Sequence, residues 1–194
     1  AVPSVSYLVI GIEHLVLGLD HVLFVIGLVL FIRAPWMLLK TITAFTTAHS
    51  ITLALSIFNV VSLPQAPVEA VIALSIVFLA RELAQEEQRR SVLTRAQPWL
   101  MAFAFGLLHG LGFAGALSDI GLPEDAIGMS LLLFNLGIEI GPLLIIALFL
   151  IVARVWHLIT KHLNYTQAHL YKGAAFGMGI LASYWTIDRT LVLL

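Results

Sequence analysis

The sequence predicts an all-α polytopic membrane protein, in which residues 1–194 form a single transmembrane domain, a bundle of about six helices. Three observations lead to this fold class. The chain is 60% hydrophobic and only 11% charged, whereas soluble domains are about 45–50% apolar and about 25% charged. Its apolar residues gather into stretches of about 20 residues, the length of a helix that crosses a bilayer. Lysine and arginine gather in alternate connections between these stretches, a bias typical of membrane proteins.

The apolar stretches define the expected helices in chain order. They cover residues 6–32, 36–59, 67–84, 98–118, 126–152 and 170–193. The first stretch is long, and it forms either one continuous span or two pieces. Prolines at positions 64, 67, 98 and 123 mark helix starts or loops, because proline lacks the backbone N–H that a helix interior needs.

The basic residues predict how the bundle is oriented. They fall in the first, third and fifth connections, as Arg33 and Lys40, then Arg81, Arg89, Arg90 and Arg95, then Arg154, Lys161 and Lys172. The second and fourth connections carry none. Positive charge marks the cytoplasmic side, so both termini are expected outside. The chain begins with Ala1, and either a removed signal peptide or trimming of the chain explains this start.

Two connections carry further polar residues. The charged segment 81–95 is expected to extend the third helix into solvent, with side-chain pairs such as Glu86 and Arg90. The fifth connection holds His157, His162 and His169. We expect these histidines near lipid headgroups rather than in a cytoplasmic metal-handling patch.

Six polar side chains inside the predicted spans indicate the functional site. They are His14, Asp20, His21, His49, His109 and Glu139. A charge or an imidazole in hydrocarbon costs several kcal/mol without a partner, so such residues are candidates for function. Four imidazoles and two carboxylates are also a ligand set for a divalent metal. The chain has no cysteine, which excludes disulfides, thiolate metal sites and cysteine nucleophiles.

The six candidates are expected at similar depth, between the midplane and the outer surface, and this predicts one shared site. His14 and His21 are seven residues apart, so they share a helix face but lie about 10 Å apart along a straight helix. One ion can therefore reach both only if the helix breaks, and Gly18 between them allows a break. A straight helix instead implies two metal positions. Each candidate also has a structural interpretation, as a buried polar group satisfied by a neighbouring helix.

Four further residues are expected to support the site. Asn135 lies four residues before Glu139, so the two side chains stack on one helix face. Glu69 opens the third span, Ser50 follows His49, and Glu13 either supports the site or faces the headgroups.

Glycines next to the candidates predict close helix approach. Gly106 and Gly110 flank His109, and Gly137 and Gly141 flank Glu139, each pair at the spacing that lets two backbones meet. Near the candidates these glycines are also expected to allow a kink. Gly173 and Gly177 have the same spacing, and we expect them to serve tight packing only.

Five segments carry a resemblance to a known family. They are residues 11–24 (GIEHLVLGLDHVLF), 44–53 (AFTTAHSITL), 69–75 (EAVIALS), 105–114 (FGLLHGLGFA) and 134–141 (FNLGIEIG). Through them the chain resembles the HupE/UreJ family of bacterial membrane proteins, which are hydrogenase and urease accessory proteins. The resemblance implies a multi-pass protein of the bacterial inner membrane with a nickel permease role. Carried over residue by residue, it gives the same six residues as metal candidates.

Two functions from different classes fit these residues. The first is a permease for a divalent transition metal, nickel, zinc or copper, with one or two ions bound by nitrogen and oxygen ligands. The second is an intramembrane metal-dependent hydrolase with a one- or two-metal centre built from the same residues, acting on a peptide or lipid, with Glu139 or Asp20 as general base. A metal sensor or assembly factor is a third alternative.

The partners follow from these functions. We expect the metal ion and membrane lipids, together with metalloenzyme-maturation proteins or a membrane-presented substrate, and no nucleic acid. A permease also needs polar residues across the inner half of the membrane, for which Thr41, Thr43, Thr46 and Thr47 are the main candidates.

Overall fold

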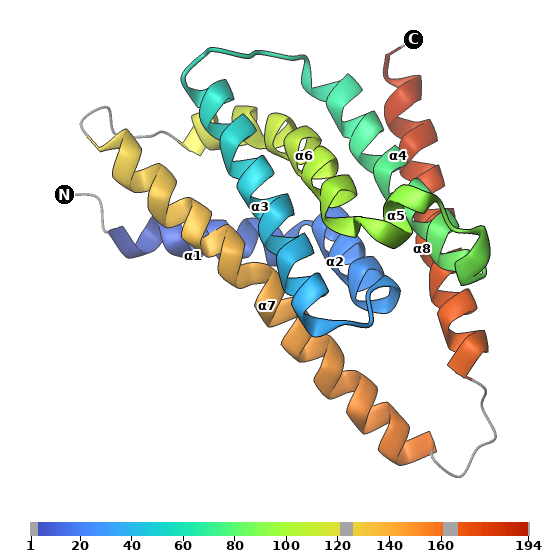
Figure 1. The fold of residues 1–194 in the computed structure, drawn as a ribbon. Helices are drawn as coiled ribbons and strands as arrows, with labels where there is room; N and C mark the ends of the chain where they lie inside the picture. The colour runs from blue at the N-terminus through green and yellow to red at the C-terminus, as the bar shows by residue number, and fades with distance from the viewer. Residues whose placement is uncertain (1–3, 121–125, 161–166, 194) are drawn as a thin grey trace.

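The computed structural model describes residues 4–120, 126–160 and 167–193, and within these ranges it contains helices and no strand (Figure 1). The helices are α1 (Ser4–Leu17), α2 (Leu19–Phe31), α3 (Pro35–Ile57), α4 (Gln65–Ala84), η1 (Glu87–Arg89), α5 (Val92–Ala96), α6 (Pro98–Ile120), α7 (Ile127–Thr160) and α8 (Gln167–Leu191). The all-α part of the predicted fold class is therefore confirmed.

The predicted apolar stretches correspond to the long helices. The first becomes α1 and α2, which are bent by 70° at their junction, and the others become α3, α4, α6, α7 and α8. By length and composition, Ile127–Trp156 is the one helix in the described ranges that can cross a membrane. The bent pair Val5–Leu17 and Leu19–Phe31 makes a second if it counts as one span. The six membrane crossings thus stay a prediction.

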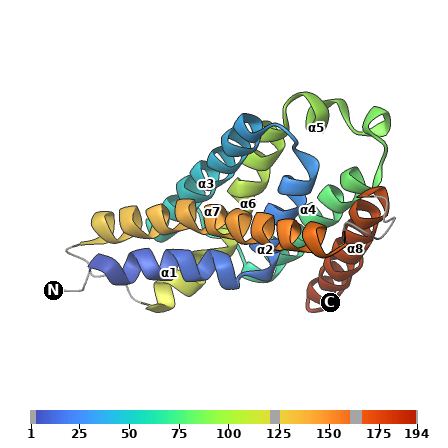
Figure 2. The ribbon, with the colours of Figure 1, turned by 90° about the horizontal axis from the view of Figure 1, so that it is seen from below.

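The long helices pack mainly in three pairs. α1 lies along α7, α3 along α6, and α4 along α8 (Figures 1 and 2). α2 links these pairs, because it contacts α3, α4, α7 and α8 as well as α1. One apolar cluster, which includes Phe24, Phe45 and Leu79, joins α2, α3, α4, α6 and α8. A second, which includes Leu15, Phe134 and Ile138, joins α1 to α7.

Glycine sets how closely two of these pairs approach. A methyl group at Gly106 would overlap the carbonyl oxygen of Phe45 on α3, and one at Gly110 would overlap the carbonyl oxygen of His49. In the same way, Gly137 on α7 has room for hydrogen only beside the Leu8 carbonyl oxygen of α1. The predicted close approach at these glycines is confirmed, and it brings α3 and α6 into direct backbone contact beside two candidate histidines.

Gly173 and Gly177 behave differently from the prediction. A methyl group at either would meet no atom within 4 Å in the described part of the chain, so the expectation that they serve tight packing is wrong. The reason is that α8 packs with another face, which carries the buried residues Ala175, Met178 and Ala182.

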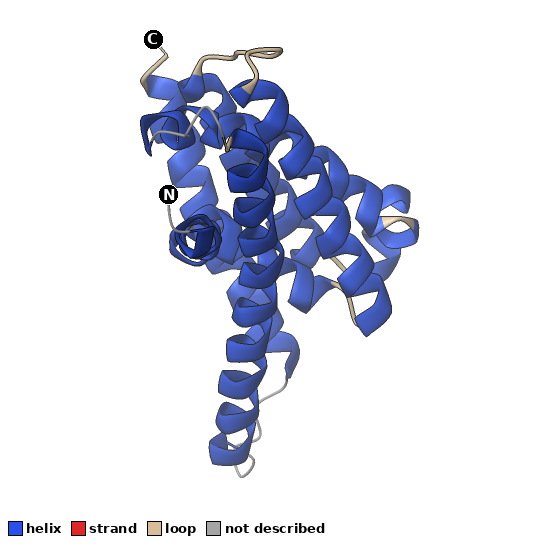
Figure 3. Cartoon of the chain, turned by 90° about the vertical axis from the view of Figure 1, so that its left-hand side faces the viewer, coloured by secondary structure: helices blue, strands red, loops and turns tan. Residues whose placement is uncertain are grey.

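The second half of α7 presents apolar side chains outward. Figures 1 and 3 show this part of the helix extending beyond the other helices. Only 28% of the most apolar stretch of α7 is buried. Leu148, Ile151 and Val155 are among its exposed residues. A long helix with large apolar side chains in the open is suited to contact with lipid tails or another protein.

The segment after α4 also differs from the prediction. α4 ends at Ala84, and the following residues form the short helices η1 and α5 instead of a solvated extension of the helix. The cause is Glu82, which is fully buried. Its carboxylate accepts hydrogen bonds from the backbone N–H of Ser91 at 2.8 Å and from the Thr94 hydroxyl at 2.6 Å. These bonds fold the segment back onto α4.

The crossing of α3 and α6 can be tested at Gly106. Replacing it in Gly106→Ala forces a methyl group against the Phe45 carbonyl, so the free energy of unfolding should fall by about 1–3 kcal/mol. Chemical denaturation of the purified protein in detergent measures this. Gly173→Ala is the matched control, because its methyl group meets nothing, and it should leave stability unchanged or raise it by up to about 1 kcal/mol. Equal effects of the two variants would contradict the close crossing.

Candidate metal centre

The break at Gly18 brings His14 and His21 together. Glycine is a poor helix former, and a methyl group at this position would lie 2.8 Å from both the His14 carbonyl oxygen and Nδ1 of His21. Because α2 turns away by 70°, the two imidazole centroids are 4.8 Å apart, instead of the roughly 10 Å that a straight helix would impose. Of the two alternatives for the first stretch, the structure has the broken helix.

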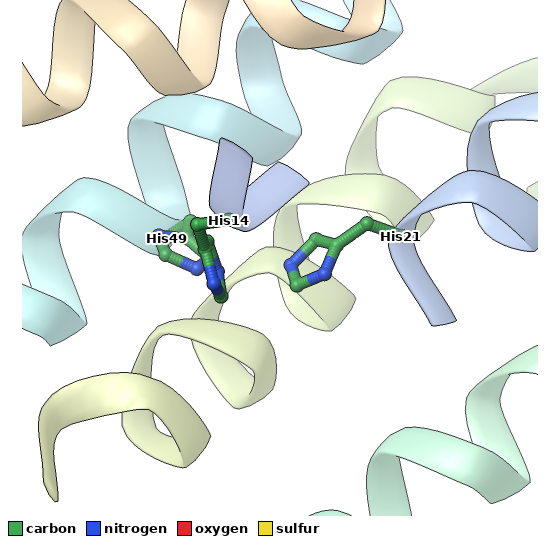
Figure 4. A group of neighbouring side chains, drawn as sticks. All are labelled: His14, His21 and His49. Carbon is green, nitrogen blue, oxygen red and sulfur yellow. The ribbon is translucent and has the colours of Figure 1, made fainter. Parts of the chain in front are cut away.

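His49 completes a group of three imidazoles from α1, α2 and α3. Its ring centroid is 5.8 Å from those of both His14 and His21, and Figure 4 shows the three side chains pointing toward one another. One nitrogen from each ring lies within 4.8 Å of the others. Nitrogens around a tetrahedral zinc lie about 3.3 Å apart. This spacing is looser than in a closed structural site.

His109 on α6 adds a fourth imidazole beside this group. Its ring centroid is 5.1 Å from that of His21, and its Nδ1 lies 2.8 Å from the Phe105 carbonyl oxygen. A carbonyl can only accept, so Nδ1 carries the proton and Nε2 keeps its lone pair. The neighbouring Gly110 is the point where α6 meets the His49 backbone. The close crossing of α3 and α6 therefore positions His109 beside His21.

Asp20 lies behind His21. One carboxylate oxygen accepts the backbone N–H of His21 at 2.9 Å and lies 3.1 Å from Nδ1 of the same residue. An ionised carboxylate only accepts, so Nδ1 donates and Nε2 of His21 is left with its lone pair. A carboxylate in this position fixes the tautomer and orientation of an imidazole that binds metal. Asp20 thus acts through His21 in this arrangement.

Four ring nitrogens of His21, His49 and His109 have no hydrogen-bond partner within the described residues. His21, His49 and His109 are buried, with 4%, 0% and 1% of their surface exposed. Nε2 of His21, Nε2 of His109 and both ring nitrogens of His49 are buried without a hydrogen-bond partner in the described ranges. A buried polar atom left unpaired costs about 1–3 kcal/mol. Several of them directed into one place fit a site that receives a ligand.

Glu139 is next to this cluster and faces α3. One carboxylate oxygen accepts from the Thr43 hydroxyl at 3.0 Å, and the other accepts from the Thr46 hydroxyl. These threonines precede His49 by six and three residues, about 9 and 4.5 Å along the helix. Glu139 therefore lies toward the Pro35 end of α3, and it is outside the group of nitrogens within 4.8 Å of one another.

The residues expected to support the site have varied surroundings. The Ser50 hydroxyl donates to the Thr46 carbonyl at 2.8 Å. Asn135 is half-buried, with its carbonyl oxygen unpartnered in the described chain, and it follows Phe134, whose ring is 5.9 Å from that of His14. Glu13 is exposed. Glu69 accepts from Gln65 at 2.7 Å and pairs with Arg189 at 3.5 Å.

The histidines of the fifth predicted connection cannot be compared with the cluster. His162 lies outside the described residues, and so do the side chains of His157 on α7 and His169 on α8.

Sequence reasoning missed the aromatic residues that line the cluster. The ring of Phe45 is 5.0 Å from that of His109 and 6.1 Å from that of His21, and Phe24 is 5.8 Å from His109. Their spacing gave a signal, because Phe24 follows His21 by three residues and Phe45 precedes His49 by four, so each lies one helical turn from a candidate. Aromatic walls exclude water and so strengthen electrostatic interactions inside the site.

The fold and the site together define a class: a helical protein in which three buried imidazoles and one half-buried imidazole from four helices meet, three of the four close enough to hold one metal ion. A family model described as HupE / UreJ protein matches residues 2–189, nearly the whole chain. The chain therefore belongs to the HupE/UreJ family, as its motifs indicated. A search of curated proteins and a search of solved structures each found no match.

The role of Asp20 can be tested by Asp20→Asn. This change removes the negative charge behind His21, and loss of such a partner typically weakens metal binding about 10–100-fold. Calorimetric titration of the purified protein with nickel measures the affinity. Glu13→Gln is the matched control, because it removes an exposed carboxylate seven residues earlier and should leave the affinity unchanged. Wild-type affinity in Asp20→Asn would show that the Asp20–His21 pair serves folding alone.

Proposed function

We propose that this protein is a multi-pass membrane protein that binds a divalent transition metal, nickel or a similar ion, and carries it across the membrane through the cluster of His14, His21, His49 and His109. The observation that carries the proposal is the convergence of three imidazole nitrogens within 4.8 Å, with His109 beside them. Nitrogen donors without thiolates suit nickel, zinc and copper(II).

The charge around the cluster supports a dication as cargo. A bare divalent ion in a low-dielectric interior needs nearby negative charge. Asp20 supplies one carboxylate behind His21, and Glu139 supplies a second toward the Pro35 end of α3. Neutral imidazoles complete the coordination without adding positive charge.

The polar residues of α3 support passage as well as binding. Glu139, Thr46 and Thr43 are hydrogen-bonded to each other on the Pro35 side of His49. They continue the polar surface toward the Pro35 end of α3, near Lys40 and the preceding Arg33, which the charge pattern predicts to be cytoplasmic. An ion in transit needs such successive positions, each of modest affinity.

The membrane placement rests on the family, the apolar composition and the exposed apolar face of α7. A hydrolase is favoured less by these contacts, because Asp20 is bonded to His21 and Glu139 to two threonine hydroxyls. A general base must lie within hydrogen-bond reach of the proton that it takes from water, and the contacts described for these two carboxylates are with protein groups.

Metal binding is tested by the metal content of variants. His21→Ala and His49→Ala each remove a buried candidate ligand, so after dialysis against a fixed concentration of nickel the purified variants should hold much less nickel than the wild type, by elemental mass spectrometry. His157→Ala is the control, and it should retain as much as the wild type. Circular dichroism establishes that the variants remain helical. If both folded cluster variants keep wild-type nickel, the shared site is wrong.

Transport is tested by nickel flux into liposomes that enclose a metal-sensitive dye. Glu139→Gln keeps the imidazoles but removes the charge on the Pro35 side of the cluster. We expect it to bind nickel and to carry it more slowly than the wild type. If the wild type binds nickel but shows no flux, it is a metal-binding protein, and the proposal of a permease is wrong. Two tightly held ions per chain would favour a two-metal centre.

A further inference from the structure

We propose that the protein has a second, anion-binding site, a basic cavity between the ends of α2 and α4 and the start of α8 that holds a phosphate-bearing group. This site is separate from the cluster of four histidines, and it uses none of those residues.

The cavity has two adjoining parts. The larger, of about 430 Å³, is lined by residues 30, 31, 33, 83–87, 89, 90, 171 and 172. The smaller, of about 250 Å³, is lined by residues 31–34 and by the segment before α6. Phe31, Arg33, Glu87 and Arg90 line both. The larger part alone is in the range of small-molecule sites, about 300–1,000 Å³.

The charge of the lining selects for an anion. Basic side chains outnumber acidic ones, with Arg33, Arg89, Arg90, Arg95 and Lys172 against Glu86 and Glu87. In the described part of the chain, the ion pairs are made by other residues, namely His21 with Asp20, Arg81 with Glu82 and Arg189 with Glu69. The five basic groups thus keep their charge for a ligand.

Arg90 is the central residue of the site. Its guanidinium carbon lies 4.5 Å from the centroid of the Phe31 ring. Its Nε is buried without a hydrogen-bond partner among the described residues. A guanidinium packed over a ring has lost much of its freedom, and its planar donors match the oxygens of a phosphate. Because Arg90 lines both parts of the cavity, its guanidinium is well placed to bind such an oxygen.

The segment that carries Arg89, Arg90 and Arg95 is held in place before any ligand binds. Glu82 accepts from Arg81 at 2.7 Å as well as from Ser91 and Thr94, and it fixes the fold-back that contains Arg89, Arg90 and Arg95. A preformed wall lowers the entropy that binding costs. This gives the buried carboxylate of Glu82 a role beyond stabilising the connection.

Two sources can supply the phosphate. One is the headgroup of an anionic phospholipid, for which the apolar side chains of Leu30, Phe31 and Leu83 in the same lining provide a surface for the start of the lipid tails. The other is a soluble phosphate. Basic pockets between helices on the cytoplasmic side are suited to anionic headgroups. The lipid source depends on the proposed membrane placement, and the soluble source does not.

Ligand binding is measured on the full-length protein after lipid removal in a neutral detergent. Phosphatidylglycerol, phosphatidylcholine and inorganic phosphate are added separately, and the thermal midpoint and bound mass are followed by thermal unfolding and native mass spectrometry. We expect the wild type to bind phosphatidylglycerol and gain stability, and phosphatidylcholine to have little effect. Equal effects of the two lipids, together with no effect of phosphate, would overturn the proposal.

Variants locate the site. Arg33→Gln with Arg90→Gln should weaken the binding of phosphatidylglycerol about tenfold or more. Arg154→Gln is the matched control, because it removes an exposed arginine that lines neither cavity part. Arg33→Gln alone, at an exposed side chain, is used if the double variant does not fold. Unchanged binding in the folded cavity variants would refute the site.

Three measurements distinguish the two phosphate sources and test this proposal independently of the metal proposal. Binding of phosphatidylglycerol without phosphate identifies a lipid headgroup site, and binding of phosphate alone identifies a site for a soluble anion. Nickel content is measured in the same variants and should not change. A failure of the metal proposal therefore leaves this one intact, and the reverse also holds.

Discussion

The bend at Gly18 is the constraint on which the cluster of four histidines depends. His14 and His21 share a face of one apolar stretch, but a straight helix would hold them too far apart for one ion. The glycine leaves room for the His14 carbonyl and the His21 ring, and the Asp20 carboxylate binds the first turn of α2 through the His21 N–H. The same carboxylate orients the His21 ring. Four neighbouring residues thus build the bend and half of the cluster together.

The other half of the cluster depends on how closely α3 and α6 cross. His49 comes from α3 and His109 from α6, and the two helices meet at Gly106 and Gly110, where backbone contacts backbone. A larger residue at either glycine would separate the helices and move His109 away from His21. Helix packing and metal chemistry are therefore linked here, since glycines that permit the crossing are next to a residue that would bind the ion.

The surroundings of the two ends of α2 differ in chemistry. The imidazoles are enclosed by Phe24 and Phe45, which favours interactions between a metal ion and its ligands over hydration. Glu139 and two threonines continue the polar surface along α3. Beyond the far end of α2, the fold-back held by Glu82 collects arginines around a cavity. The apolar residues of α2 between His21 and Phe31 separate the proposed cation site from the proposed anion site.

Composition and spacing were enough to predict the helices, their glycine crossings and the residues that would be costly to bury without a partner, because these are properties of single segments. The sequence also restricted His14 and His21 to two arrangements. Only the tertiary structure decided between them, since the 70° bend depends on what α2 packs against. It also separated Glu139 from the clustered nitrogens and left Gly173 and Gly177 without neighbours. Sequence spacing determines which residues share a face of one helix, whereas contacts between helices depend on packing among segments distant in the chain.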